Sequence, residues 1–168
     1  MMMLGVDPGL SGAIALLTQD RQLVGVWDMP KHAKAKGKGN EINAYILADL
    51  MVDIMQVVKD RGEKVEATIE QVGPMPRDSR PAAMKFGDSV GVMRGALGCH
   101  YVPMRWAAPG VWKRYHSLLK QPKEASRMLA MSKWTSQRDL FVRVKDDGRA
   151  EAALIADFGI NFAGWGQE

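Results

Sequence analysis

The sequence predicts an α/β protein in which helices flank a mixed five-stranded sheet. Two observations carry this prediction: short apolar runs bounded by turn-forming residues open the chain, and apolar positions at helical spacing then alternate with further apolar runs. The 168 residues are 46% hydrophobic and 25% charged, which suits one ordinary globular unit. We therefore expect a single domain over residues 1–168.

The first three strands are expected to form an antiparallel meander. They cover the apolar runs 3–7, 12–18 and 23–29. Pro8-Gly9 and the polar stretch 19–22 supply the turns between them. Residues 31–40 then combine four lysines and two glycines with almost no large apolar side chain, which predicts a mobile basic loop.

Helices and two more strands follow. Apolar residues recur at helical spacing from residue 41, with Asn40 as the expected N-cap and Gly62 as the expected C-terminal stop. A buried strand over 67–71 ends at the turn formers that begin with Gly73. The same patterns predict helices near 82–97, 110–118, 123–134 and 148–158, and a strand over 100–104.

Two acids end strands that the topology places side by side. With right-handed crossovers and the fourth strand beside the first, the strand order is 3-2-1-4-5, the ribonuclease H-like arrangement. Asp7 and Glu70 each end an apolar strand, and this order makes their strands parallel neighbours that finish at one carboxyl edge. Two ionised carboxylates this close share a proton or recruit a cation, and Mg²⁺ prefers oxygen ligands. The pair predicts a metal site.

The start of the last helix supplies further acids. At about 100° per residue, Asp147 and Glu151 share a helix face, whereas Asp146 and Glu151 lie about 140° apart, so Asp147 is preferred. Asp7, Glu70, Asp147 and Glu151 then surround two ions, and paired metals roughly 3.5–4 Å apart stabilise both oxygens of an in-line phosphoryl displacement. We expect phosphodiester hydrolysis. Each acid alone also fits a plain structural role at a turn, a strand end or a helix N-terminus.

Five stretches of the chain, in this order, resemble the RuvC-type Holliday junction resolvases, nucleases of the ribonuclease H-like superfamily, and in particular their short phage-like members. They cover nearly the whole chain: LGVDPG (4–9), IEQV (69–72), PGVWK (109–113), KEASR (123–127) and RAEAALIA (149–156). The resemblance implies a homodimeric crossover junction endodeoxyribonuclease. It would bind four-way or other branched DNA and use Mg²⁺ or Mn²⁺, and its paired symmetric nicks would leave 5′-phosphate and 3′-hydroxyl ends.

The sequence departs from the family pattern at two places. The last acidic pair of the family is usually spaced i, i+3 with Asp or His first, but position 148 is glycine, and the match falls on Asp147 after a shift of one residue. Many members also carry an aromatic wedge just after the Glu-Gln-Val stretch, where this chain has Gly73. Met75 is the nearest substitute, and the alternative is a different strand opening or base preference.

Basic residues follow the segment that the family uses to hold the scissile phosphates. The resemblance implies DNA contacts from Lys113 and Lys123 first, then from Arg127. We also expect Arg77 and Arg80 to reach phosphate, because they follow Glu70 in the same loop. Lysine and arginine there would supply charge without reading sequence. The other interpretation is a solvated helix face. The tryptophans in the region are assigned to packing alone.

A glycine ridge is predicted on the helix that begins near residue 82. Gly87, Gly91 and Gly95 recur every four residues, at a cost of up to about 1 kcal/mol each in a helix. Something should therefore approach this face closely. The resemblance implies the same helix of a second copy, and a two-fold dimer suits a two-fold substrate. Contact with the sheet of the same chain, or with another of its helices, is an equally good interpretation.

Other classes of protein are weighed against the nuclease. The stretch Asp7 to Gly12 also resembles the phosphate loop of sugar kinases, actin and chaperone ATPases, but those proteins need two lobes and roughly twice this length, and no second glycine-rich loop is found. We expect no nucleotide cofactor. A non-catalytic module that binds branched DNA remains an alternative, as do related nucleases acting on RNA hybrids or flaps.

Composition also bears on partners and location. The net charge of +4 is compatible with an anionic partner. Cys99 is the only cysteine, and the start of the chain lacks the features of a secretory signal. No apolar run approaches the roughly 18 residues that span a bilayer. We expect a protein of the cytoplasm, in a bacterial or phage-infected cell, without a membrane partner.

Overall fold

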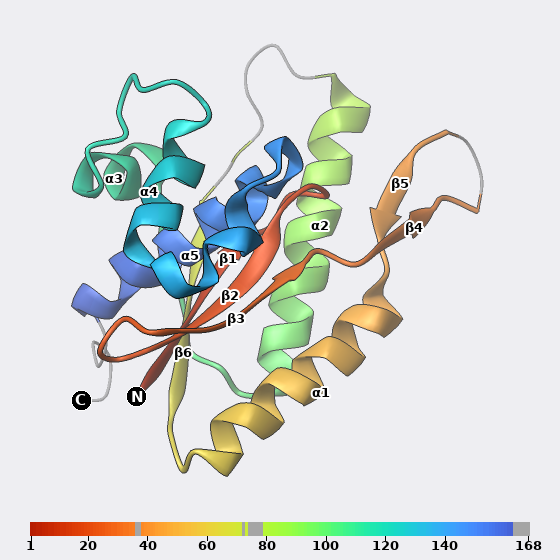
Figure 1. Ribbon diagram of the computed structural model, residues 1–168. Coiled ribbons are helices and arrows are strands. Elements are labelled where there is room, and N and C mark those ends of the chain that lie inside the picture. Colours follow the sequence, from red (N-terminus) through yellow and green to blue (C-terminus); the bar gives the residue numbers. More distant parts are fainter. Residues whose placement is uncertain (36–37, 72, 74–78, 163–168) are drawn as a thin grey trace.

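A mixed sheet forms the centre of the molecule. The computed structural model describes residues 1–35, 38–71, 73 and 79–162. The strands of the sheet are β1 (Met2–Asp7), β2 (Ala13–Thr18), β3 (Leu23–Asp28), β6 (Val65–Glu70) and β7 (Met104–Ala107). They run in the order β3-β2-β1-β6-β7, with β1 antiparallel to β2 and parallel to β6 (Figure 1). The predicted order and the ribonuclease H-like arrangement are confirmed, because β6 and β7 are the fourth and fifth strands.

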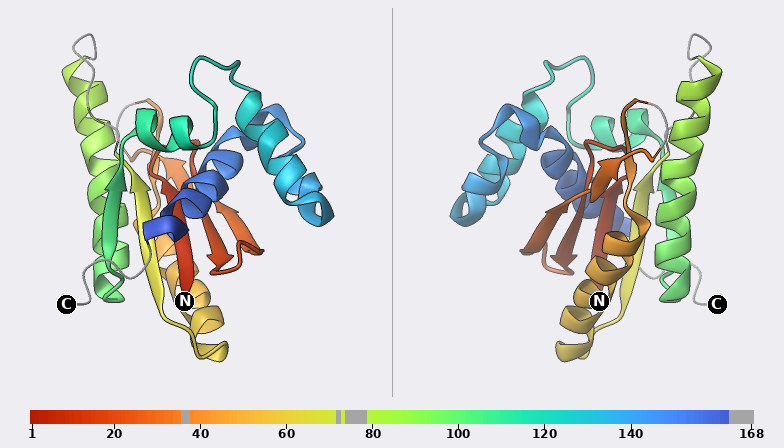
Figure 2. Two further views of the ribbon diagram at one scale, coloured as in Figure 1. Left: turned by 90° about the vertical axis from the view of Figure 1, so that its left-hand side faces the viewer. Right: turned by 90° about the vertical axis from the view of Figure 1, so that its right-hand side faces the viewer.

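Helices cover both faces of the sheet (Figure 2). One face carries α1 (Ala44–Asp60) and α2 (Arg80–Cys99), and the other carries α5 (Asp147–Gly159) together with α3 (Pro109–Tyr115) and α4 (Ala125–Lys133). Short 3-10 segments connect or extend the later helices at Thr135–Phe141, Val144–Asp146 and Ile160–Phe162. No helix within the described ranges combines the length and apolar character that crossing a membrane requires.

Alternation along β1 divides the core into two halves. Met2, Leu4 and Val6 pack with α1 and α2, and each fully buried side chain of this kind contributes about 1.5–3 kcal/mol. The intervening residues face α5. A Cβ added at Gly5 would collide with the backbone of Ala152 and Ala156, so the missing side chain lets α5 lie directly on β1. This contact sets how closely the last helix approaches the carboxyl edge.

The basic segment 31–40 differs from the prediction. Its ends form a small antiparallel hairpin of β4 (Lys31–Ala33) and β5 (Asn40–Ile42), so a loop throughout is wrong; residues 36 and 37 lie outside the described ranges. The two strands are held by backbone hydrogen bonds between mostly polar residues, so the sequence shows no alternation of apolar residues that would predict them. Helix α1 accordingly begins later than predicted. Asn43 replaces Asn40 as its N-cap, and Asn43 Oδ1 accepts a hydrogen bond from the Ile46 amide at 3.1 Å.

The fifth strand also lies elsewhere than predicted. Helix α2 continues to Cys99, the link through Tyr101 turns with a φ of 54°, and β7 begins only at Met104. The predicted strand over 100–104 is therefore wrong in its bounds, because apolar residues in the turn resemble those of a strand. The expected stop of α1 is present: the helix ends at Asp60, and Gly62 has a φ of 64°, which suits glycine.

Candidate active site

Asp7 and Glu70 lie next to each other at the carboxyl edge of β1 and β6. Val6 pairs with Ile69 in the parallel register, so the following residues on the two strands are neighbours. Val6 and Ile69 belong to the core under α1 and α2, and the next residues therefore point to the opposite face, toward α5. Strand order and side-chain alternation together bring these two acids to one place.

The loop after β1 is folded around the carboxylate of Asp7. Asp7 Oδ1 accepts a hydrogen bond from the Gly9 amide at 3.0 Å, which is an Asx-type turn. A Cβ added at Gly12 would collide with the backbone and the carboxyl carbon of Asp7. The Asp-Pro-Gly-x-x-Gly pattern thus produces a tight loop that fixes the direction of the acid. None of the described residues forms an ion pair with Asp7.

Glu70 is held by a tryptophan to which the sequence assigned packing alone. Trp112 is fully buried on α3, and its indole Nε1–H donates a hydrogen bond to Glu70 Oε1 at 2.9 Å. Glu70 is only 7% exposed, so this bond fixes one of its two oxygens in a largely dry environment. No local pattern in the sequence signals this role, because the bond joins residues 42 positions apart.

Burial raises the pKa of both carboxyl groups. Burial raises the pKa of Asp7 to about 6, against the opposing effect of the Gly9 hydrogen bond. Burial likewise raises the pKa of Glu70 to about 7, where the Trp112 bond opposes the shift and the charges of Asp7 and Glu151 add to it. Near neutral pH the site therefore holds negative charge at a cost that a bound cation would relieve.

Glu151 joins this pair, together with one lysine. Lys113 Nζ lies 3.2 Å from Glu151 Oε1 and 5.0 Å from the centre of the Trp112 ring. The positive charge of Lys113 lowers the pKa of Asp7 and of Glu70, and the negative charge of Glu151 raises both. Three carboxylates and one ammonium group thus share one electrostatic environment at the edge of the sheet.

Asp147 lies on the same side of α5 but is held by other cations. Its carboxylate is 2.7 Å from Arg127 Nε and 3.1 Å from Lys123 Nζ. Asp146, the alternative left by the helical spacing, is 1% exposed and is bound by the backbone amide and the guanidinium of Arg143. Its side chain closes a capping box with Arg143 on the 3-10 segment Val144–Asp146 and is buried, whereas the side chain of Asp147 is 17% exposed.

Position 148 can hold only glycine in this packing. A Cβ added at Gly148 would collide with the carbonyl oxygen of Ser11 and with Gly12, in the loop that follows Asp7. The acid that the resemblance expects three residues before Glu151 therefore has no room here. The close contact that excludes it also brings the start of α5 against the Asp7 loop.

The chemistry of these side chains suits a divalent cation. Carboxylate oxygens are the ligands that Mg²⁺ and Mn²⁺ prefer, and the two strand-end acids have raised pKa values that a cation would lower. In the described part of the chain, no group of three acidic, histidine or cysteine side chains is already arranged to hold a metal ion. Lys113 instead pairs with Glu151 beside the two strand-end acids.

The predicted DNA-binding residues differ in where they lie and what they contact. Lys113 and Lys123 line a small cavity of about 70 Å³ next to Glu151, and the side chain of Lys123 is 82% exposed. Arg127 is 13% exposed and also donates to the Val142 carbonyl, so it ties α4 to the start of α5. Arg80 is exposed as the first residue of α2. Arg77, and also Met75, lie outside the described residues.

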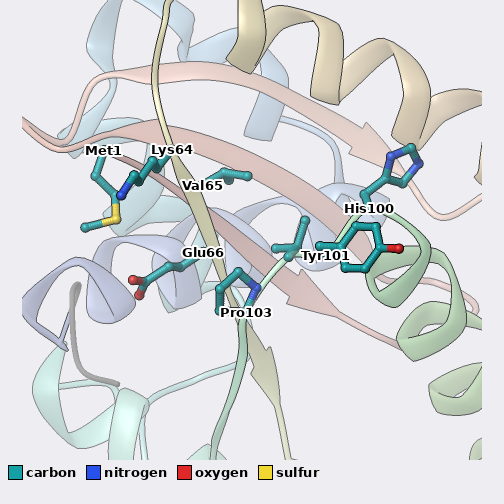
Figure 3. Close-up of a pocket in the computed structure, with 8 residues that line it drawn as sticks. Met1, Lys64, Val65, Glu66, His100, Tyr101 and Pro103 are labelled. Atoms are coloured by element: carbon teal, nitrogen blue, oxygen red, sulfur yellow. The ribbon is translucent and has the colours of Figure 1, made fainter. Parts of the chain in front are cut away.

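A larger hollow lies at the other end of the sheet. It measures about 310 Å³, and Figure 3 shows Lys64, Val65 and Glu66 of its lining beside His100 and Tyr101. These residues flank the start of β6, whereas Glu70 ends that strand. None of the predicted site residues lines this hollow, so size alone does not mark the candidate site.

Comparison with known proteins supports the fold assignment. No protein-family model matches the sequence, and no match is found among curated proteins. Among solved structures, the chain is similar to Thermus thermophilus RuvC in complex with a Holliday junction substrate, at a TM-score of 0.63 and 14% identity over 97% of this chain and 96% of that one. It is also similar to another structure of Thermus thermophilus RuvC, at a TM-score of 0.55 and 16% identity over 96% of each chain. The chain therefore has the ribonuclease H-like fold of the RuvC-type resolvases.

Proposed function

We propose that the chain is a metal-dependent endonuclease that resolves Holliday junctions or other branched DNA by paired symmetric nicks. The observation that carries this proposal is the meeting of Asp7 and Glu70 at adjacent strand ends, with Glu151 beside them, in a fold similar to RuvC. Open α/β sheets place their chemistry at this edge. The raised pKa values at the edge are typical of functional carboxylates.

In the proposed mechanism Asp7, Glu70 and Glu151 hold divalent cations, Mg²⁺ or Mn²⁺, as a two-ion site. Asp147 is the proposed fourth ligand, and it would have to release Arg127 and Lys123 to take part. Such ions, when bound, would stabilise the attacking and leaving oxygens of phosphodiester hydrolysis, leaving 5′-phosphate and 3′-hydroxyl ends. Trp112 would keep Glu70 in place through its hydrogen bond to Oε1.

Basic side chains around the acids would hold the DNA backbone. Lys113 is one-third exposed, and it would exchange Glu151 for a phosphate oxygen when the site is loaded. Lys123 would do the same on leaving Asp147, and Arg80 would contact phosphate from the start of α2. Arg127 would likewise turn to a phosphate once Asp147 has left it, and a contact from Arg77 remains part of the proposal. All these contacts are independent of sequence.

The proposed enzyme acts as a homodimer through α2. Gly87, Gly91 and Gly95 are exposed, and a Cβ added to any of them would meet no atom of the described residues within 4 Å. The interpretation in which the sheet or another helix of the same chain fills this ridge is therefore wrong. A second copy of α2 is the proposed partner, because close approach is what a glycine ridge permits. Two sites related by a two-fold axis would allow paired nicks in a junction.

The test compares substrates and variants in one assay. The protein is incubated with a four-way junction, a linear duplex and an RNA–DNA hybrid, with and without Mg²⁺, beside Asp7→Asn and Glu70→Gln. We expect Mg²⁺-dependent nicking of the junction that falls at least about 100-fold in either variant while junction binding persists. Binding by the wild type without nicking would assign the chain to the non-catalytic alternative. Nicking by the variants at the wild-type rate would contradict the proposed site.

A further inference from the structure

We infer that the β4–β5 hairpin and the adjoining part of α2 form a second DNA-binding surface, which grips the backbone of a duplex arm away from the cut. The hairpin surface is defined here by Lys31, Lys34, Lys38 and Lys85. This inference rests on the proposed function and adds a partner contact that the acidic site itself does not require. Figure 1 shows the hairpin projecting beside the sheet on the side opposite to α3 and α4.

The base of the hairpin contacts the loop that follows Asp7. Lys31 Nζ donates to the carbonyl oxygen of Leu10, in the loop that follows Asp7, at 3.2 Å. On the other strand Ile42, which pairs with Lys31, is 4% exposed and anchors the hairpin in the core. The hairpin is therefore a fixed extension of the carboxyl edge, and DNA seated on the acids would have to pass near it.

The far part of the hairpin lies against α2. The Lys34 amide donates to the Gly39 carbonyl at 3.0 Å, which closes the end of the ladder. Lys85 Nζ lies 3.9 Å from the place where a Cβ on Gly39 would stand. The backbone of Lys34 and that of Lys38, the residue before Gly39, thus lie close to the point that the Lys85 side chain reaches from α2.

Three of the four lysines of this surface have no acid paired with them among the described residues. Within the described ranges none of Lys34, Lys38 and Lys85 forms an ion pair. The acid on the hairpin, Glu41, faces His32 at 3.2 Å. Holding like charges together without acids costs folding energy, which binding to a polyanion recovers.

A hollow lies beside the base of the hairpin and the loop after Asp7. It measures about 240 Å³, and its lining includes Ser11 of that loop together with Lys31 and Lys145. The acid that lines it, Asp28, is already paired with Arg149 through two hydrogen bonds of 2.6 Å. Positive charge therefore continues from the loop after Asp7 to the hairpin.

The chemistry of the surface favours a nucleic-acid backbone over a protein partner. Every residue of β4 is exposed, and β4 carries a lysine, a histidine and an alanine, with no large apolar side chain. Stable protein interfaces depend on several buried aromatic or aliphatic anchors, whereas the exposed large apolar side chain nearest these lysines is that of Met84, beside Lys85 on α2. Contacts to phosphates need only positioned lysine and arginine charges.

The test removes two charges and follows DNA binding. Lys34→Gln/Lys38→Gln is compared with Lys59→Gln/Lys64→Gln, which removes the same charge from exposed positions at the other end of the sheet. Binding of a long-armed junction is measured in EDTA over a range of salt. We expect the hairpin variant to bind about tenfold more weakly near 0.1 M salt, with a log K against log salt slope smaller by about 2, because each phosphate contact contributes about 0.9. The control pair should bind as the wild type does.

Hydroxyl-radical footprinting locates the lost contact. In the hairpin variant, protection should disappear from the backbone of an arm while protection at the cut remains, and Lys34→Arg/Lys38→Arg should restore it. If the wild type nicks the junction but the hairpin variant keeps its affinity, slope and footprint, the inference is wrong and an acidic protein becomes the better partner. If the wild type neither binds nor nicks the junction, the proposed function itself fails.

Discussion

Burial opposes the charge on the carboxylates that end β1 and β6. Both acids lie at strand ends with little access to water, and one hydrogen bond to each, from the Gly9 amide and the Trp112 indole, together with the charge of Lys113, only partly offsets the lost hydration. Without a bound cation, the folded protein is therefore less stable when the carboxyl groups of Asp7 and Glu70 are ionised than when they are protonated. The proposed site therefore carries a cost in stability that binding of its ions would remove.

This cost predicts a pH dependence for the metal-free protein. The pKa of Asp7 is about 6 and that of Glu70 about 7 in the folded state, above ordinary values of 3.8 and 4.5. The folded state then binds more protons than the unfolded state, so stability falls as pH rises from about 4 to about 7. Asp7→Asn should lose part of this slope and, at pH 8 in EDTA, melt roughly 3 °C above the wild type, the shift that about 1 kcal/mol produces.

Melting curves between pH 4 and 8 check this prediction. Asp53→Asn, a change at an exposed acid on α1, should follow the wild type throughout and serves as the control. Addition of Mg²⁺ should reverse the order at pH 8, because only the wild type gains binding energy. If the melting temperatures of the wild type and Asp7→Asn changed with pH in the same way, burial of the Asp7 carboxylate would not destabilise the folded protein.

At the scale of elements, the exposed ridge on α2 and the tight face of α5 show two uses of glycine. Gly5 and Gly148 let α5 pack on β1 and on the Asp7 loop, where a side chain would collide. The glycines of α2 face open space instead, although α2 packs on the core through Met93 and Leu97. Glycine destabilises a helix, so a glycine ridge that contacts nothing would lower the stability of α2 with no compensating interaction.

The dimer proposal predicts the effect of filling the ridge. Gly91→Leu adds a side chain where the chain has room, so the monomer should remain folded, but two copies of α2 can no longer approach closely. We expect the wild type to sediment as a dimer and the variant to dissociate at least about tenfold more readily. Ala48→Leu, which adds bulk to the exposed face of α1, should remain dimeric. A monomeric wild type, or an unaffected Gly91→Leu, would contradict the proposed interface.

Sequence patterns predict elements better than they predict contacts between them. Asp7 and Glu70 could be paired in advance because period-2 strands, strand order and strand ends are local or topological properties. The Trp112 bond to Glu70 joins residues 42 positions apart, and nothing local to either one signals it. The β4–β5 hairpin was missed because its pairing depends on backbone hydrogen bonds between polar residues. Helical spacing correctly placed Asp147 on the same helix face as Glu151. It could not predict the ion pairs of Asp147 with Arg127 and Lys123, because they depend on how α4 and the segment before it pack against α5.

Across the whole molecule, basic side chains lie on two sides of the proposed site. Asp7, Glu70 and Glu151 lie together at the carboxyl edge of the sheet, Lys113 and Lys123 lie on the α3–α4 side, and the hairpin lysines lie on the opposite side. The net charge of the chain is only +4, so the placement of these charged side chains, more than the net charge, determines the electrostatic potential at the carboxyl edge. A polyanion could thus be held from two sides over a site that accepts divalent cations.

The most direct test of this account is the anomalous scattering of a crystal soaked in Mn²⁺. The account predicts anomalous peaks bounded by the carboxylates of Asp7, Glu70 and Glu151, with Lys113 displaced from Glu151, and no peak in crystals of Glu70→Gln. Manganese absent from these side chains at saturating concentration, with Lys113 still paired to Glu151, would contradict the central claim.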